Sequence, residues 1–381
     1  MQTATIKGRG SLSNKTPRFE ALQREAVDDD WAPGEPGDAP RRPTTVAVEQ
    51  AKSIISHNSS PDIYFDQSIN PYRGCEHGCV YCYARPTHAY LNLSPGLDFE
   101  TRLYAKQNAA ELLRKELSSP SYVPKLIALG ANTDPYQPIE RRLRITGAIL
   151  AVLEEFNHPV AITTKSASVT QDLDLLARMA SKGLARVFMS IGSLDGDIAR
   201  TLEPRASAPG ARMQAIRKLS EAGIPTGVIV APVIPALNDC DIEKILFGAR
   251  DAGAQDAAYN VLRLPLEVAD LFREWLLRHY PLRAAHVMNL VRQMRSGKEY
   301  DSDFRTRMRG SGAYAELIRQ RFRRACAQAG LNQRRTLLRT DLFVRAQAPQ
   351  PARRQAAERR SPPYRAAAPR VAEASPQLTL F

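Results

Sequence analysis

Six short apolar segments, separated by amphipathic ones, dominate residues 67–280 and limit the folds that this chain can adopt. The apolar segments are typical of strands buried on both faces of a sheet, and they span residues 68–70, 125–129, 160–163, 186–191, 226–231 and 257–262. The other segments have helical periodicity, and several end at a glycine; they span residues 109–117, 142–156, 171–182, 210–222, 239–252 and 267–278. A repeated strand–helix unit predicts an α/β fold with a parallel sheet.

The number of units favours an open barrel. Six strand–helix units fall short of the eight that close a barrel, so we expect a partial (β/α)6 barrel over residues 57–280. A doubly wound sheet has the same local pattern and is the alternative. In both folds ligands bind at the carboxyl ends of the strands.

The flanking regions differ from this pattern in composition. Residues 1–56 carry Pro33, Pro36, Pro40 and Pro43 among scattered charges, which predicts a flexible N-terminal arm. Residues 281–345 predict a basic helical extension, and residues 346–376, mostly Ala, Pro, Arg and Gln, predict a disordered linker. A short apolar peptide, residues 377–381, ends the chain.

Positive charge is concentrated in the last third of the chain. The net charge is +13, and residues 271–381 hold 23 Lys and Arg against 8 Asp and Glu. This asymmetry predicts a polyanionic partner, DNA before a membrane, although an Arg-biased composition explains part of it. No apolar run is long enough to cross a bilayer and no secretory signal precedes the fold, so we expect a cytoplasmic protein without a membrane partner.

Three of the five cysteines lie together directly after the first expected strand. Cys75, Cys79 and Cys82 have C-x3-C-x2-C spacing, and thiolates on one loop favour an iron–sulfur cluster or zinc. A [4Fe–4S] cluster held by three cysteines leaves one iron open to another ligand. Zinc would need a fourth ligand, and His77, Cys240 and Cys326 are poorly spaced for that role. Chance clustering of structural cysteines is the remaining alternative.

The segment CEHGCVYC, residues 75–82, resembles the C-x3-C-x-aromatic-C signature of the radical S-adenosylmethionine (SAM) superfamily. The resemblance implies a partial (β/α)6 barrel in which Cys75, Cys79 and Cys82 ligate a [4Fe–4S] cluster. It further implies that SAM chelates the open iron. A reductant such as flavodoxin or ferredoxin supplies the electron that cleaves SAM to a 5′-deoxyadenosyl radical, which takes hydrogen from the substrate.

Two further segments, HNSSPDIYFDQSINPYRGC (57–75) and LGANTDPYQPIE (129–140), resemble the spore photoproduct lyase branch, described as DNA repair photolyase-like. The resemblance extends over residues 57–331. It implies that SAM is bound by residues at the ends of the second to fourth strands and just beyond, namely Asn132, Thr133, Asp134, Lys165, Ser190, Ser193, Arg200 and Glu203.

One departure concerns the hydrogen donor. The lyase uses a cysteine thiol near its second-strand motif, whereas residues 130–134 here contain none, which argues against repair of a spore-type thymine dimer. Cys240, after the fifth strand, is a candidate donor, and Tyr136 and Tyr259 are candidate relays. An ordinary packing role is the alternative for each of them.

The last five residues resemble the peptide by which bacterial repair and replication proteins bind the sliding clamp of DNA polymerase. Gln377 would bind at the rim of the clamp pocket while Leu380 and Phe381 fill it. Together these features predict a radical SAM enzyme, lyase-like or a transferase, that repairs or modifies a DNA base. The alternatives are a radical SAM enzyme acting on RNA, protein or a small molecule, and a non-catalytic iron–sulfur module.

Overall fold

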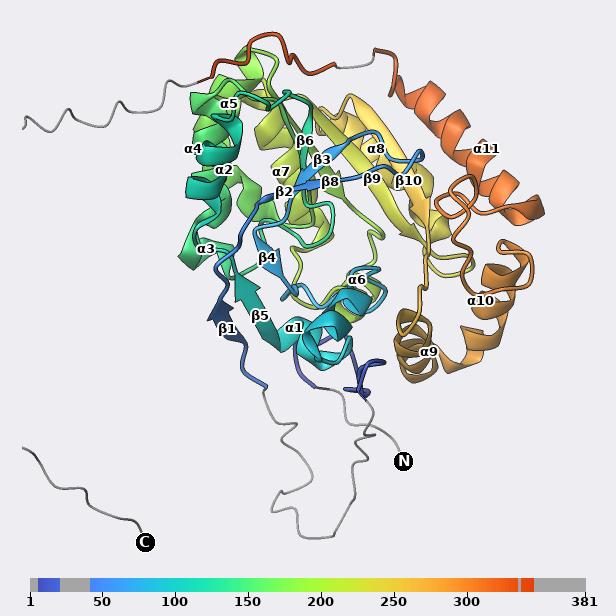
Figure 1. The fold of residues 1–381 in the computed structure, drawn as a ribbon. Coiled ribbons are helices and arrows are strands. Elements are labelled where there is room, and N and C mark those ends of the chain that lie inside the picture. Colours follow the sequence, from blue (N-terminus) through green and yellow to red (C-terminus); the bar gives the residue numbers. More distant parts are fainter. Residues whose placement is uncertain (1–5, 21–41, 335–336, 346–381) are drawn as a thin grey trace, which may run out of the picture. The chain divides into compact units, whose positions relative to one another are not determined.

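A seven-stranded sheet is the framework of the fold (Figure 1). The computed structural model describes residues 6–20, 42–334 and 337–345, and these lie within one compact unit, Met1–Ala346. The strand order is β10-β9-β8-β7-β6-β3-β2. In chain order the strands are β2 (Ile55–His57), β3 (Gln67–Ile69), β6 (Ile127–Leu129), β7 (Val160–Thr164), β8 (Ala185–Ser190), β9 (Thr226–Val233) and β10 (Asp256–Val261).

Helices follow the strands as the sequence pattern predicts. They cover the outer face of the sheet and are α2 (Ala109–Leu117), α4 (Ile145–Glu155), α5 (Leu173–Ser181), α7 (Pro209–Glu221) and α8 (Ile242–Asp251). Shorter elements shape the loops: η1 (Arg85–Leu91), α1 (Leu97–Thr101), α3 (Glu140–Leu143), η2 (Ala167–Asp172), α6 (Gly196–Leu202) and η3 (Asp239–Asp241). After β10 the described residues form three further helices: α9 (Val268–His279), α10 (Pro281–Gln293) and α11 (Gly312–Ala329).

The predicted α/β fold class is confirmed. The strands β3 and β6 to β10 pair in parallel and lie in chain order, while β2 pairs antiparallel at one edge. A doubly wound sheet would reverse direction at a switch point, and this order does not reverse, so the barrel-type winding is the one observed. Within the described residues, the edge strands β10 and β2 do not pair with each other.

Two apolar clusters hold the fold together. The larger one packs β-strand side chains such as Ile162 and Val187 against the outer helices. The second cluster joins α9 and α10 to the loops beyond the carboxyl ends of the strands; Trp275 and Phe272 pack there with Val80, which lies between Cys79 and Cys82. The cysteine segment is therefore anchored in an apolar core.

The described parts of residues 1–56 are packed, which corrects the prediction of a flexible arm. Strand β1 (Thr45–Val48) pairs with β5 (Arg102–Ala105), and β5 pairs with β4 (Tyr72–Arg73), in a three-stranded sheet. Residues 6–20, which we call the N-terminal strap, contain the buried residues Arg9, Ser11 and Leu12. A buried Arg needs hydrogen-bond partners, and Arg9 finds them far along the chain, at the carbonyls of Glu100 and Arg42, which composition does not reveal.

The basic C-terminal segment also packs more closely than an extension would. In α11, Ile318, Phe322 and Cys326 belong to the larger core, and Arg321 pairs with Glu243 of α8 at 2.7 Å. Arg295, only 1% exposed, donates to the carbonyls of Leu262, Thr306 and Arg307. Several arginines that suggested a nucleic-acid surface therefore have structural partners.

The predicted linker at 346–376 and the clamp-like residues Gln377, Leu380 and Phe381 lie outside the described residues. Within the described ranges, no helix is both long and apolar enough to span a membrane.

Candidate active site

A cavity of about 200 Å3 lies at the carboxyl ends of the parallel strands. Its wall contains residues from the cysteine segment and from the ends of β6 to β10. The lining residues are Cys75, His77, Cys79, Tyr81, Cys82, Tyr83, Gly130, Asn132, Asp134, Thr163, Thr164, Lys165, Ser190, Ile229, Ala231, Pro232, Asn260, Val261 and Arg263.

Glycines allow the cysteine segment to fold tightly against its neighbours. Gly74 and Gly78 both have positive φ, at 75° and 68°, a conformation that favours glycine. A Cβ at Gly78 would lie 2.8 Å from Glu100 Oε2, and one at Gly74 would lie 2.8 Å from the Phe99 carbonyl oxygen. The loop that carries the three thiols therefore depends on both glycines.

A buried ion pair between Arg85 and Glu100 holds the backbone of this loop. Arg85 is fully buried and donates from Nε to the Cys79 carbonyl at 2.8 Å and from Nη2 to the Gly78 carbonyl at 3.2 Å. Its Nη2 also pairs with Glu100 Oε1 at 2.5 Å. Glu100 accepts the backbone N–H groups of Gly10 and Ser11 at 3.0 and 2.9 Å, so one carboxylate joins the strap to the cysteine loop.

Burial dominates the acid–base chemistry of the thiols. It raises the pKa of the Cys75 thiol, and nearby Asp134 adds to the effect. Burial likewise raises the pKa of Cys79, with Glu203 contributing. A thiolate at either position therefore needs a cationic partner inside the cavity, and iron is such a partner.

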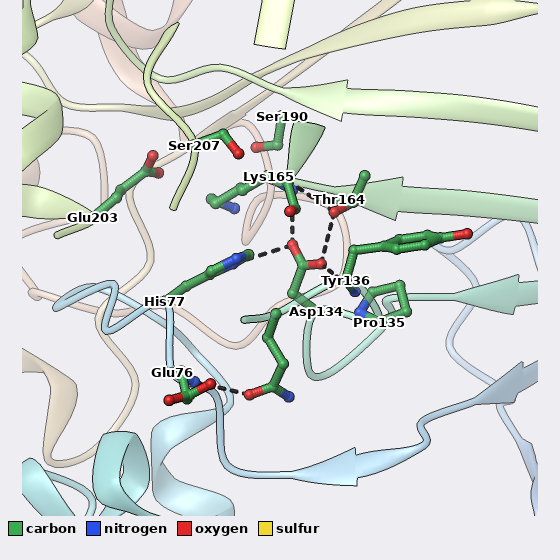
Figure 2. A network of polar contacts seen from close by, with 12 residues as sticks. Glu76, His77, Asp134, Pro135, Tyr136, Thr164, Lys165, Ser190, Glu203 and Ser207 are labelled. Carbon is green, nitrogen blue, oxygen red and sulfur yellow. Dashed lines mark hydrogen bonds and ion pairs between the residues drawn. The ribbon is translucent and has the colours of Figure 1, made fainter. Parts of the chain in front are cut away.

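Asp134 is the centre of a polar network (Figure 2), and it lines the same cavity as the three thiols. Its carboxylate accepts the Thr164 hydroxyl and the Lys165 backbone N–H, both at 2.7 Å, and lies 3.3 Å from His77 Nδ1. Burial opposes ionisation of Asp134, but His77 and these hydrogen bonds outweigh it and lower its pKa to about 2. Asp134 therefore stays anionic and fixes the loop after β6 against the end of β7.

A second buried network lies on the other side of Lys165. Glu203 accepts hydrogen bonds from the Tyr81 hydroxyl and from Arg212, and Arg212 also donates to the Ser190 carbonyl at 2.7 Å. Burial works against the charge on Lys165, but Cys79 and Glu203 outweigh it and raise the Lys165 pKa. Lys165 thus presents a permanent positive charge to the cavity.

Comparisons with known proteins agree with this geometry. A sequence profile described as the Radical SAM superfamily matches residues 69–247. An uncharacterised protein of Mycobacterium tuberculosis is 37% identical over 231 residues, which are 60% of this chain and 68% of that protein.

The chain belongs to the radical SAM superfamily.

Other similarities extend over much of the chain. An uncharacterised protein of Methanocaldococcus jannaschii is 27% identical over 232 residues, covering 61% of this radical SAM chain and 82% of that protein. The fold is similar to that of a tyrosine-to-phenylalanine mutant of spore photoproduct lyase, with a TM-score of 0.51 and 19% identity over 81% of this chain and 88% of the lyase. A cysteine-to-serine mutant of the same lyase has a TM-score of 0.51 and 18% sequence identity. The match covers 75% of this chain and 80% of the lyase.

The cofactors of this radical SAM protein are a [4Fe–4S] cluster and SAM. The residues present fit such a cluster, since three thiols line one cavity and burial disfavours the anionic form of Cys75 and Cys79 without a metal. They also fit SAM, because Lys165 offers a cation and Asp134 an anion on the same wall.

The cavity brings together part of the predicted SAM-binding set. Asn132, Asp134, Lys165 and Ser190 line it. Thr133 does not, because it is buried with its hydroxyl donating to the Tyr72 carbonyl at 2.9 Å.

Two of the remaining predicted residues lie farther away. The Ser193 hydroxyl donates to Asp241 at 2.7 Å. Arg200 has a side chain 72% exposed and pairs with Asp197 on its own helix. Glu203 contacts the lining residue Tyr81 without lining the cavity itself.

The candidate hydrogen donors are also outside the cavity wall. Cys240 is exposed in η3. The Tyr136 side chain is buried, and its hydroxyl donates to Asp172 at 3.0 Å. Tyr259, the second candidate relay, is buried beneath Arg309, whose Cζ lies 3.9 Å from the ring centroid.

Several residues of the site carry no sequence signal of their own. Arg85, Glu100 and Arg212 act through partners that only the fold brings near. Tyr83 and Arg263 also line the cavity. Tyr83 is the exception among these residues, because its place directly after Cys82 is a sequence signal that it lies near the cluster.

Proposed function

We propose that this chain is a radical SAM enzyme that takes hydrogen from a nucleic-acid base, in DNA repair or modification. The observation that carries the proposal is the convergence of Cys75, Cys79 and Cys82 with the Asp134 and Lys165 networks on one cavity. Spore photoproduct lyase, whose fold is similar, has been solved in complex with a dinucleoside spore photoproduct. That likeness and the basic C-terminal third support a DNA substrate.

In this proposal each group has a defined task. Cys75, Cys79 and Cys82 hold the cluster, Lys165 pairs with the carboxylate of SAM, and Asn132, Asp134 and Ser190 contact the rest of it. When bound, the cluster and SAM supply a 5′-deoxyadenosyl radical able to take hydrogen from a substrate. Glu203 and Arg212 are positioning residues, because they hold Tyr81 and the end of β8 without lining the cavity.

The first test is whether the reduced protein cleaves SAM. We expect the anaerobically reconstituted chain to form 5′-deoxyadenosine with dithionite, measured by liquid chromatography and mass spectrometry. The Cys79→Ala variant, treated identically, is expected to form none. If wild-type protein with a complete cluster and bound SAM forms no 5′-deoxyadenosine, the result favours a non-catalytic iron–sulfur module.

The second test concerns the substrate class. Cells grown in deuterated medium provide DNA, RNA, protein and small-molecule fractions, each offered separately to the reduced enzyme. We expect deuterium in 5′-deoxyadenosine from the DNA fraction. Deuterium from another fraction alone would contradict the DNA proposal and identify the alternative class.

We further propose that Gln377, Leu380 and Phe381 bind the sliding clamp, which would raise the local concentration of the enzyme at DNA. The support is the sequence of the peptide and its place after an Arg- and Pro-rich segment. Deleting residues 377–381 is expected to abolish co-elution with purified clamp. A chain with Thr379 replaced by Ala, between Gln377 and Leu380, is the matched control and should still bind.

A further inference from the structure

Two cationic side chains line the cavity, whereas SAM has a single carboxylate for them to bind. Lys165 follows β7 and Arg263 follows β10, and both line the wall. Among the described residues, neither has a carboxylate within ion-pairing distance. SAM carries one carboxylate, which the proposed function assigns to Lys165. Arg263 therefore has a charge that SAM does not neutralise.

The two cations reach the cavity from strands that are not neighbours. Strands β7 and β10 are three positions apart in the strand order, with β8 and β9 between them. A carboxylate held by Lys165 thus leaves Arg263 to a different group.

The guanidinium of Arg263 has unused donors. Its Nε is buried without a hydrogen-bond partner. The Nη atoms have only weak partners. One donates to Met308 Sδ, a weak acceptor, at 3.5 Å, and the other contacts the Tyr300 hydroxyl at 3.5 Å, at the outer limit of hydrogen bonding to oxygen. A buried donor without a partner is costly, so this group is suited to an incoming acceptor.

Nearby charges do not supply that acceptor. Asp62 lies close enough for Arg263 to lower its pKa, but the stronger influence comes from Arg307, which holds both Asp62 oxygens at 2.6 Å. Arg295 donates to three backbone carbonyls. Of these three arginines, Arg263 is the one that faces the cavity.

Tyr83 places an aromatic ring beside this cation. The Arg263 Cζ lies 5.0 Å from the centroid of the Tyr83 ring, and Tyr83 remains 44% exposed. Its hydroxyl donates to the Ala131 carbonyl, which fixes the ring. An aromatic face next to an arginine is the combination that binds a base and its phosphate in single-stranded nucleic acid.

We propose that Arg263 binds the phosphodiester next to the target nucleotide and that Tyr83 supports the stacked base. The proposal rests on the proposed function and deepens it, because it says which side of the cavity receives DNA. Arginine presents a planar fork of donors that matches phosphate oxygens. The anion is a phosphate because the DNA backbone carries one at every nucleotide.

The test compares Arg263→Gln and Arg263→Lys with the wild type as reconstituted, anaerobic holoenzymes. The probe is a short fluorescein-labelled single-stranded DNA, read by anisotropy over a salt series. We expect Arg263→Gln to bind about tenfold more weakly and to lower the salt slope by about 0.7. Arg263→Lys should keep the salt slope and recover part of the affinity. Arg178→Gln is the matched control, since Arg178 is 58% exposed on α5 and pairs with Glu154.

A second arm locates the contact on the DNA. Single phosphodiester linkages of the DNA are replaced, one at a time, by neutral methylphosphonates. We expect one such replacement to weaken DNA binding by the wild type but not by Arg263→Gln. Affinity for SAM, measured separately, should not change in Arg263→Gln.

The outcomes are distinguishable. If each methylphosphonate substitution weakens DNA binding equally in wild type and in Arg263→Gln, this inference is overturned and the proposed function still stands. Loss of SAM affinity with DNA binding intact overturns it too, because Arg263 would then hold the SAM carboxylate. A wild type without salt-dependent DNA binding overturns both.

Discussion

Cys79 illustrates how the protein controls a single side chain. Its thiol is buried, its backbone carbonyl accepts from Arg85, and burial raises its pKa above the ordinary range. The same burial that disfavours a bare thiolate would strengthen its bond to a cation, because water does not compete. The chemistry of this residue therefore depends on the metal.

We predict that Cys79→Ala loses iron. With three proposed thiol ligands on one loop, removal of one opens a further corner of the cluster. Iron content and the absorbance of the brown chromophore measure the loss after anaerobic reconstitution. Cys240→Ala is the control, since Cys240 is exposed and does not line the cavity; equal iron in both variants would refute the ligand assignment.

His158 makes stability depend on pH. Burial lowers its pKa to about 4 from the usual 6.5, so the unfolded chain takes up a proton first as the pH falls. The resulting stability is fully present above pH 6.5 and is lost between pH 6.5 and about 4, by up to about 3 kcal/mol. His88 has a pKa lowered to about 4 by burial as well.

We therefore expect His158→Gln to reduce the dependence of unfolding free energy on pH in this window, while His88 still contributes to the dependence that remains. Urea unfolding at several pH values measures it. His57→Gln, with an exposed histidine at the sheet edge, is the matched control. A slope equal to wild type in His158→Gln would show that His158 is not the titrating group.

At the residue scale, the sequence predicts residues of the site that lie close together in the chain. Cys75, Cys79 and Cys82 are within eight residues, so their place on one cavity wall could be predicted. Glu100 was missed because its partners include the strap, about 90 residues away, and Arg85 because its partners are carbonyls and a carboxylate that only the folded loop brings together. A charged residue gives no sign in sequence of whether it will be buried with a partner.

At the scale of elements, long buried strands could be predicted and short edge strands could not. The ends of β7 to β10 agree with the expected segments to within two residues, because continuous apolar runs mark strands buried on both faces. The strands β1, β2, β4 and β5 have two to four residues with mixed exposure. Such segments lack a periodic signal and depend on tertiary pairing.

The loop between β4 and η1 should depend on Arg85. We predict that Arg85→Met destabilises the fold by about 3–5 kcal/mol, because Glu100 would be left buried without its partner. Urea unfolding of the protein measures the change, and iron content should fall with it. Arg178→Met removes an exposed ion pair and should cost less than about 1 kcal/mol; similar costs in both would contradict this account.

Helix α11 should behave as part of the core. Ile318 is fully buried and its neighbour Leu317 is 47% exposed. We predict a loss of about 2–5 kcal/mol for Ile318→Ala and less than about 1 kcal/mol for Leu317→Ala, both from urea unfolding. A negligible effect of Ile318→Ala would restore the view of residues 281–345 as a separate extension.

At the scale of the whole molecule, the positive charge is distributed differently from what composition suggested. Within the described residues, Arg292, Arg307 and Arg321 pair with Glu299, Asp62 and Glu243. Residues 346–381, by contrast, contain six arginines and two glutamates. The last 36 residues thus contribute a net charge of +4 to any phosphate contacts, in addition to the basic residues of the described part.

We predict that deleting residues 346–381 reduces the salt slope of DNA binding by about 0.7 for each arginine that contacts a phosphate. The unfolding midpoint in urea should not change, because the core lies within Met1–Ala346. Anisotropy of labelled single-stranded DNA measures the slope. An unchanged slope would place the phosphate contacts on the folded unit alone.

The strap has a consequence for how the protein matures. A Cβ at Gly10 would lie 1.8 Å from the Gly78 carbonyl oxygen, so the strap rests directly on the cysteine loop, and Glu100 holds it there. Glu100 is made 18 residues after Cys82, which at ribosomal speeds of about 5–20 residues per second is roughly 1–4 s later. The cysteine loop is synthesised before the strap has its anchor, and this delay is a window in which iron and sulfide can be delivered to an uncovered loop.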